Sequence, residues 1–139
     1  MIYPRLAFLS LLLLLSCNAV PEPEPTCRVT RVIDGDTVDM ACGGSAPFRA
    51  RLIGFDTPET YEPRCRAEAD LGRQATDRLQ GMVATARVTQ ADLDGTDRYG
   101  RRLVRLGIDG RDVGDGLIAE GLAVPYTGGR RIDWCDRLG

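Results

Sequence analysis

The period of the hydrophobic residues changes along this chain, and that change restricts the folds open to it. From Cys27 to Phe55 the chain has short runs of β-branched residues and of alternating apolar and polar residues, as in strands with one buried face. From Cys65 to Val83 the apolar residues recur every three to four positions, as on one face of a helix. That face carries Leu71, Ala75, Leu79 and Met82.

Strand-like runs return after this helix, and the order of elements predicts the fold class. We expect strands at Cys27–Ile33, Thr37–Met40, Phe48–Phe55, Arg87–Ala91 and Gly100–Ile108. The polar segment 92–97 predicts a turn, residues 113–118 a second helix that Gly121 ends, and residues 132–138 a third. This order favours an α+β, mainly β fold: a five-stranded barrel of the oligonucleotide- and oligosaccharide-binding (OB) type with three helices. A sandwich and a ferredoxin-like sheet remain open from the pattern alone.

Residues 1–19 are interpreted as a signal peptide, because Arg5 precedes an apolar run from Leu6 to Leu15. The run is shorter than the roughly 20 residues of a membrane-spanning helix. Two cleavage sites stay open. Residues 14–17 resemble a lipoprotein box, in which Cys17 would be lipidated. Residues 17–19 suit cleavage by an ordinary signal peptidase. We expect an exported protein that is periplasmic, extracellular or anchored to a membrane through lipidated Cys17.

Residues 20–26 form a linker rich in Pro and Glu, and residues 27–139 form one domain. The domain holds four cysteines, which in an exported protein suggest two disulfides with three possible pairings. Because Cys27 and Cys42 bracket an expected hairpin, we favour Cys27 with Cys42 and Cys65 with Cys135. On a loop-entropy model these bonds contribute about 3 and about 4 to 5 kcal/mol.

The basic residues restrict the chemistry, because all 18 are Arg and the chain has no Lys and no His. Mechanisms that need an imidazole base, a His metal ligand or a Lys nucleophile are therefore excluded. Catalysis must use carboxylates, hydroxyls, thiols, guanidinium groups or a bound metal.

Several acidic residues follow the expected strands closely. Asp34 and Asp36 are two positions apart in extended chain, so their carboxylates point to the same side. Asp56 ends the third strand and precedes Thr57 and Glu59. If these strands are neighbours, the acids meet at one rim, where they raise each other's pKa unless a cation lies among them. Such an oxygen site suits Ca²⁺; the alternative is turn chemistry with solvated acids.

Arg51 and Arg101 are the candidate phosphate-binding residues. Arg101 follows a polar turn at the start of a strand, where barrel loops bind ligands. A guanidinium binds two phosphate oxygens at once and keeps its charge. Carboxylates, a metal and two arginines are together the parts needed for phosphodiester hydrolysis.

Four sequence blocks, Val32–Val38, Arg51–Thr60, Asp97–Arg101 and Gly121–Ala123, resemble the staphylococcal nuclease (thermonuclease) family in order and spacing. The resemblance implies a five-stranded barrel with three helices and a Ca²⁺-dependent endonuclease that acts on DNA and RNA and leaves 3′-phosphate ends. The alternative function is a non-catalytic exported barrel that binds nucleic acid, an oligosaccharide or a partner protein.

The resemblance also implies a role for each site residue. Asp36 and Asp56 would be carboxylate ligands of Ca²⁺, Thr57 would bind it through its carbonyl, and Asp34 would act through water. Glu59 would orient or deprotonate the attacking water, while Arg51 and Arg101 would bind the phosphate and stabilise the transition state. Tyr99 and Tyr126 would contact the substrate. Three protein ligands are fewer than the roughly 6 to 8 oxygens that Ca²⁺ takes, so we expect weak metal binding without substrate.

Two features of the sequence qualify this expectation. Arg51 and Asp56 are an odd number of residues apart, so a straight strand would place them on opposite faces; a bulge or bend near Gly54 would bring them together. Removal of Arg5 with the signal peptide leaves 17 Arg against 20 acidic residues, a net charge of −3. Because of this negative charge, we expect weak binding to short or single-stranded nucleic acid, with strong salt dependence. We also expect a monomer.

Overall fold

The computed structural model describes residues 26–87 and 89–139. The predicted signal peptide, the lipidation candidate Cys17 and the linker up to residue 25 lie outside this part of the chain. No helix among the described residues is long and apolar enough to cross a membrane.

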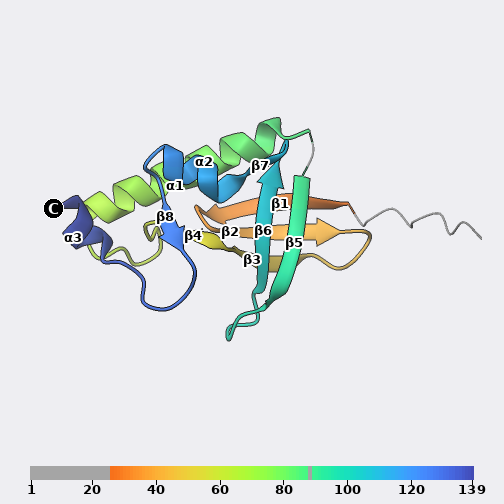
Figure 1. Cartoon of the computed structure of the whole chain (residues 1–139), viewed down its shortest axis with the longest axis horizontal. Coiled ribbons are helices and arrows are strands. Elements are labelled where there is room, and N and C mark those ends of the chain that lie inside the picture. The colour runs from red at the N-terminus through yellow and green to blue at the C-terminus, as the bar shows by residue number, and fades with distance from the viewer. Residues whose placement is uncertain (1–25, 88) are drawn as a thin grey trace, which may run out of the picture.

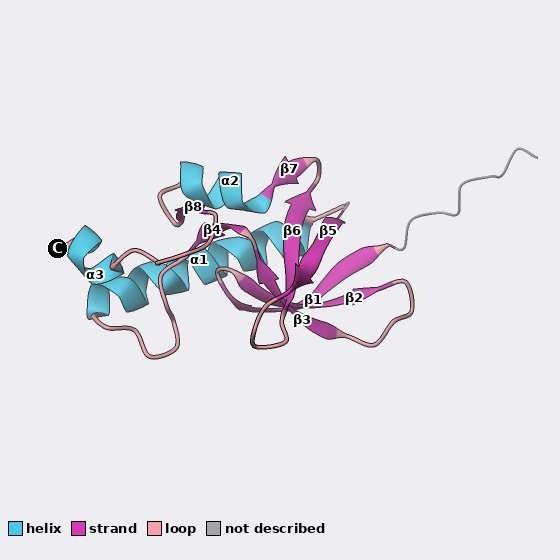
Figure 2. Cartoon of the chain, turned by 60° about the horizontal axis from the view of Figure 1, so that its bottom comes forward, coloured by secondary structure: helices cyan, strands magenta, loops and turns pink. Residues whose placement is uncertain are grey.

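In the described part of the chain, the long strands form one curled sheet in the order β1-β2-β3-β6-β5 (Figures 1 and 2). The strands β1 (Cys27–Asp34), β2 (Thr37–Cys42) and β3 (Phe48–Leu52) form an antiparallel meander. Strand β6 (Arg102–Ile108) pairs in parallel with β3 and antiparallel with β5 (Thr89–Thr96). A short strand, β7 (Arg111–Asp112), extends the edge of β6.

Three helices complete the described fold, and they confirm the predicted α+β class with an OB-like sheet. Helix α1 (Arg66–Thr85) lies along the sheet, α2 (Val113–Ala119) lies near its C-terminal half, and α3 (Trp134–Leu138) lies beside its N-terminal end (Figure 1). Cys65 caps α1, because its sulfur accepts from the main-chain N–H of Glu68 at 3.4 Å. Of the predicted apolar face, Ala75 and Leu79 are fully buried.

The core lies between the concave side of the sheet and helices α1 and α2. Its buried members come from most elements: Val38, Met40, Ala50, Leu52, Phe55, Leu79, Val104, Leu106, Val113, Leu117 and Ala123. Thr37 and Arg51, which line the cleft described below, are paired positions of β2 and β3, so the sheet fixes the backbone that carries them.

The predicted third strand is broken, and the break positions the site. Strand β3 ends at Leu52, and β4 (Gly54–Asp56) pairs instead with β8 (Val124–Tyr126). Gly54 lies at the break with φ of +98°, a conformation that residues with a Cβ rarely adopt. The bend predicted near Gly54 is therefore present, and Arg51 and Asp56 meet.

One predicted turn is wrong. Residues 92–96 continue strand β5 rather than forming a turn, because they pair with β6 from Arg105 to Arg102. A register shift between Leu93 and Thr96 accommodates the polar sequence. The strand also begins at Thr89, two residues later than expected.

Both disulfides have the pairing that the sequence favours, Cys27 with Cys42 and Cys65 with Cys135. The first joins paired positions on β1 and β2. The second joins the residue that caps α1 to helix α3 across 70 positions of sequence. The C-terminal segment is thereby tied covalently to the start of the long helix.

Candidate active site

A cleft of about 820 Å³ opens where β2 begins and β3 ends, and it brings most of the predicted site together. The predicted residues that line it are Asp34, Asp36, Arg51, Glu59, Tyr99, Arg101 and Tyr126. Asp56 and Thr57 lie beneath it, with only 1% and 2% of their surface exposed. Residues from four separated blocks of sequence therefore converge on one site.

Asp36 is a buried carboxylate that joins two of these blocks. Its Oδ2 accepts from the main-chain N–H and the hydroxyl of Thr57, at 3.2 and 3.0 Å. Its Oδ1 accepts from the hydroxyl of Thr37 at 3.2 Å and forms an ion pair with Arg51. These hydrogen bonds fix Asp36 against the loop that follows β4.

Arg51 bridges the two buried carboxylates. One terminal nitrogen pairs with Asp36, and the other donates to Oδ1 of Asp56 at 3.1 Å. The Arg51 side chain is only 13% exposed, so its charge is little screened by water. The guanidinium lies at the floor of the cleft, where a phosphate group would meet it.

Asp34 lies at the end of β1 beside Asp36. Burial, followed by the nearby charge of Asp36, raises the pKa of Asp34 from 3.8 to about 6. Gly35 between them has no room for a side chain, since a Cβ would lie 2.9 Å from Ala75 and Thr57. The Asp-Gly-Asp sequence therefore forms a turn that also packs closely against α1.

The loop that carries Glu59 is held by helix α1. The buried carboxylate of Glu68 accepts from the main-chain N–H of Arg64 at 2.7 Å and from that of Glu59 at 3.4 Å. Gly72 lets the helix approach the loop, because a Cβ there would lie 2.8 Å from the carbonyl of Pro58. The position of Glu59 thus depends on residues that sequence reasoning did not single out.

Arg101 and Tyr99 lie together on the opposite wall. Arg101 donates from Nε to Asp97 at 2.7 Å, and its guanidinium carbon lies 5.6 Å from the centre of the Tyr99 ring. Burial raises the pKa of Asp97, but hydrogen bonds from Arg101 and Tyr99 and the charge of Arg101 together lower it below its ordinary value. Tyr99 is 70% exposed, which leaves its ring open for stacking.

Tyr126 lines the cleft from β8, where Pro125 precedes it in the strand. Its hydroxyl donates to the carbonyl of Gly129 at 2.7 Å. This bond fixes the tyrosine against the connection between β8 and α3.

Two residues of the C-terminal segment belong to the site and were missed by sequence reasoning. The indole N–H of Trp134 donates to Oδ2 of Asp56 at 3.1 Å. Arg131 donates to the main-chain carbonyl of Thr57 at 3.1 Å and pairs with Asp56 and Glu59. The predicted Cys65–Cys135 bond was the available signal, since it brings residues near 131 to the loop that precedes Cys65.

The pKa of Arg131 is raised above its ordinary value, so the guanidinium stays charged. Burial lowers its pKa, but the hydrogen bond to Glu59 and the charge of Asp56 outweigh burial and raise it. Among the described residues, the cleft is lined by five arginines: Arg51, Arg98, Arg101, Arg105 and Arg131. Five acidic residues line the same cleft, Asp34, Asp36, Glu59, Asp94 and Asp97, so the arginines lie among carboxylates of equal number.

The oxygen atoms at the floor of the cleft fit a hard divalent cation. Arg51 pairs with the carboxylates of Asp36 and Asp56. Arg131 pairs with the carboxylate of Glu59 and donates to the carbonyl of Thr57. All of these groups offer oxygen atoms next to a positive charge, and carboxylate and carbonyl oxygens are the ligands that Ca²⁺ takes in proteins. The predicted ligands Asp36, Asp56 and Thr57 are among these oxygens, and their metal role stays a prediction.

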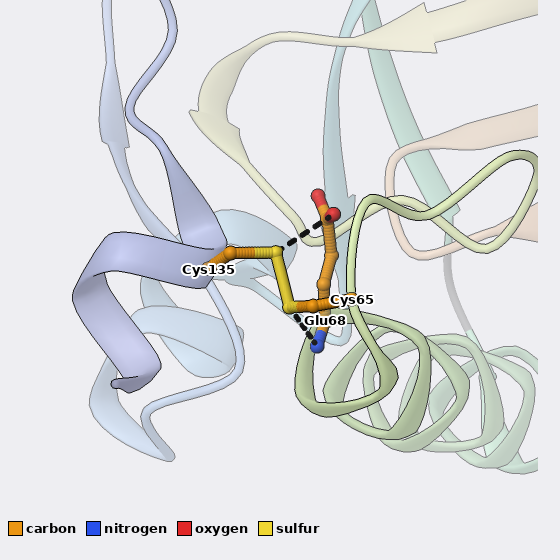
Figure 3. Close-up of side chains that lie close together, drawn as sticks. All are labelled: Cys65, Glu68 and Cys135. Atoms are coloured by element: carbon orange, nitrogen blue, oxygen red, sulfur yellow. Dashed lines mark hydrogen bonds between the residues drawn. A yellow bond between two sulfur atoms is a disulfide. The ribbon is translucent and has the colours of Figure 1, made fainter.

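A second group of possible metal ligands lies outside the cleft, at Cys65, Glu68 and Cys135 (Figure 3). The two sulfurs are bonded to each other, so neither is a thiolate, and the carboxylate of Glu68 lies 3.7 Å from the sulfur of Cys135. In the disulfide form this cluster is structural: it fastens α3 to α1.

The fold and the site together define a class of protein, an OB-like sheet with carboxylates and arginines around one cleft. Comparison with known proteins narrows the class. The family model described as staphylococcal nuclease homologue matches residues 49–133, more than half of the chain. The chain belongs to the staphylococcal nuclease family.

Individual relatives agree. The chain is 36% identical over 101 residues to the thermonuclease of Staphylococcus hyicus, a match that covers 72% of this chain and 59% of that protein. It is 36% identical over 100 residues to an uncharacterized endonuclease of Escherichia coli O157:H7, covering 71% and 60%. The chain thus spans about three fifths of the length of these relatives.

Proposed function

We propose that this protein is an exported endonuclease that hydrolyses phosphodiester bonds of DNA and RNA with the help of Ca²⁺. The observation that carries the proposal is the bridge of Arg51 across Asp36 and Asp56 at the floor of a cleft that Glu59 and Arg101 also line. Family membership and relatives named as nucleases support it.

Each residue has a proposed task. Glu59 holds or deprotonates the attacking water, and its carboxylate at the cleft is fixed through the loop that Glu68 anchors. Arg51 and Arg101 bind the phosphate and stabilise the charge that develops on it. Asp36, Asp56 and the Thr57 carbonyl would hold Ca²⁺, with Asp34 acting through water. The metal, when bound, would supply Lewis-acid stabilisation and orient the water.

Substrate binding follows from the walls of the cleft. Tyr99 and Tyr126 would contact bases, and the five arginines would attract phosphates although the whole chain is acidic. A local patch favours short or single-stranded nucleic acid bound by a monomer. By the family resemblance, cleavage at the 5′ oxygen leaves 3′-phosphate ends. The two disulfides support export, with membrane anchoring through Cys17 as one form of it.

Activity in a gel containing denatured DNA, with Ca²⁺ or with a chelator, tests the proposal. We expect clearing with Ca²⁺ and none with the chelator. The absence of clearing in both lanes would favour the alternative, a non-catalytic barrel that binds nucleic acid or a partner. Binding should also weaken steeply as salt rises, since phosphate contacts release counterions; a dissociation constant that hardly changes with salt contradicts the proposed arginine contacts.

A further inference from the structure

Arg131 lies on the oxygens that the proposed function assigns to the metal. One terminal nitrogen donates to the carbonyl of Thr57 at 3.1 Å, the other pairs with the carboxylate of Glu59, and Nε lies 2.5 Å from Oδ1 of Asp56. A single guanidinium thus contacts two of the three proposed metal ligands together with the proposed catalytic carboxylate.

The contact with Asp56 is electrostatic and poorly directed. Among the described residues, Nε of Arg131 is the buried side-chain nitrogen that lacks a hydrogen bond of good geometry. It lies close to Asp56, which also accepts from Arg51 and from Trp134. Because this N–H forms no well-aligned hydrogen bond, the guanidinium loses little hydrogen bonding when it moves away from Asp56.

The charges around Arg131 explain its place. Arg51 joins Asp36 to Asp56, and Arg131 joins Asp56 to Glu59, so that three carboxylates share two guanidinium groups. Grouped carboxylates need positive charge nearby. Arg131 supplies it from the protein itself and is held there by the C-terminal segment, through the Cys65–Cys135 bond and an ion pair of Arg64 with Asp133 at 2.8 Å.

We propose that Arg131 and a divalent cation compete for the oxygens of Asp56 and Thr57, so that the guanidinium lowers the affinity of the site for the metal. The inference rests on the proposed function, because it takes these oxygens as the metal site. Arg131 also lines the cleft, so a displaced guanidinium remains beside the substrate. The guanidinium of Arg131 neutralises part of the negative charge of these carboxylates until the metal binds.

Calcium titration of the full chain, with both disulfides formed, tests this inference by calorimetry. A second readout is the emission of Trp134, the one Trp in the sequence, whose indole contacts Asp56. The variant is Arg131→Gln. The matched control is Arg130→Gln, which removes the same charge from the neighbouring exposed residue.

We expect Arg131→Gln to bind Ca²⁺ at least about tenfold more tightly than the unchanged chain, the ratio for the charge-assisted hydrogen bond of Arg131 to the Thr57 carbonyl that binding no longer breaks. Arg130→Gln should stay within about twofold, because an exposed charge is screened by salt. In a chelator, Arg131→Gln should melt at a lower temperature than the unchanged chain, and Ca²⁺ should close that gap.

Equal or weaker Ca²⁺ affinity in Arg131→Gln overturns the inference. If this variant does not fold, Arg131→Lys decides: one ammonium cannot span three oxygens, so tighter Ca²⁺ binding supports competition and unchanged binding overturns it. The two proposals fail differently. Ca²⁺ binding to no variant refutes both the metal role and the competition, whereas Ca²⁺-dependent cleavage with equal affinities refutes the competition alone.

Discussion

The indole N–H of Trp134 donates to Oδ2 of Asp56 at 3.1 Å, across 78 positions of sequence. Both residues are buried, and Arg131 approaches the other oxygen of the same carboxylate. The C-terminal segment is therefore part of the wall of the site, and damage to it should be felt at the proposed metal ligands.

Trp134→Phe should lower the free energy of unfolding by about 1–3 kcal/mol. The phenyl ring keeps most of the packing, but the buried Asp56 loses one donor. Urea unfolding followed by circular dichroism measures the effect, since the variant has no Trp. An unchanged stability would mean that the Trp134 hydrogen bond contributes nothing to holding Asp56.

Gly54→Ala should cost about 1–3 kcal/mol of stability and reduce activity, because the bend at Gly54 brings Arg51 to Asp56. Its φ is +98°, and a Cβ would lie 2.9 Å from Nη1 of Arg105. Gly44→Ala is the matched control, with φ of +78° and nothing within 4 Å of the added atom. The two variants are compared by denaturant unfolding and by cleavage of denatured DNA. Equal losses of stability, or full activity in Gly54→Ala, would contradict this role.

Removal of the Cys65–Cys135 bond by a double Cys→Ser change should cost about 4 kcal/mol on the loop-entropy model, as against about 3 kcal/mol for Cys27–Cys42. The loops span 70 and 15 positions. The first change should also lower activity at temperatures where the protein remains folded, since it frees the segment that holds Trp134 and Arg131. Unfolding curves and cleavage rates for the two double variants check both statements. Equal activity in both would show that the site tolerates a free C-terminal segment.

Arg51→Ala should lower kcat by about 10²–10³, because its contact with the phosphate is expected to strengthen in the transition state. Arg49→Ala is the control on the same strand: its side chain is 46% exposed and pairs with Asp39 away from the cleft. Initial rates over a range of substrate concentration separate kcat from KM, with circular dichroism to verify folding. An unchanged kcat with a raised KM would reassign Arg51 to ground-state binding.

Much of the fold follows from local sequence patterns. The helical period predicted α1 to within a few residues, and the odd spacing of Arg51 and Asp56 predicted the bend at Gly54. The extent of β5 did not follow, because residues 92–96 have turn chemistry and are held in the strand by pairing with β6. Pairing between distant segments is decided by tertiary structure, which a local pattern does not contain.

The site was predictable where motifs carry it and not where tertiary contacts complete it. Seven of the predicted residues line one cleft, and Asp56 and Thr57 lie beneath it. Glu68 lies off the predicted apolar face of the helix, yet it is buried and holds the Glu59 loop. Arg131 looked like any of the 18 arginines, and only the path of the chain from β8 to α3 takes it to the carboxylates.

The most direct test of the central claim, that this cleft hydrolyses phosphodiester bonds with Glu59 as the base, is the cleavage rate of denatured DNA by Glu59→Gln in Ca²⁺. We expect the rate to fall at least about 10²-fold, the usual contribution of a general base, while the protein stays folded. A rate equal to that of the unchanged chain would contradict the account.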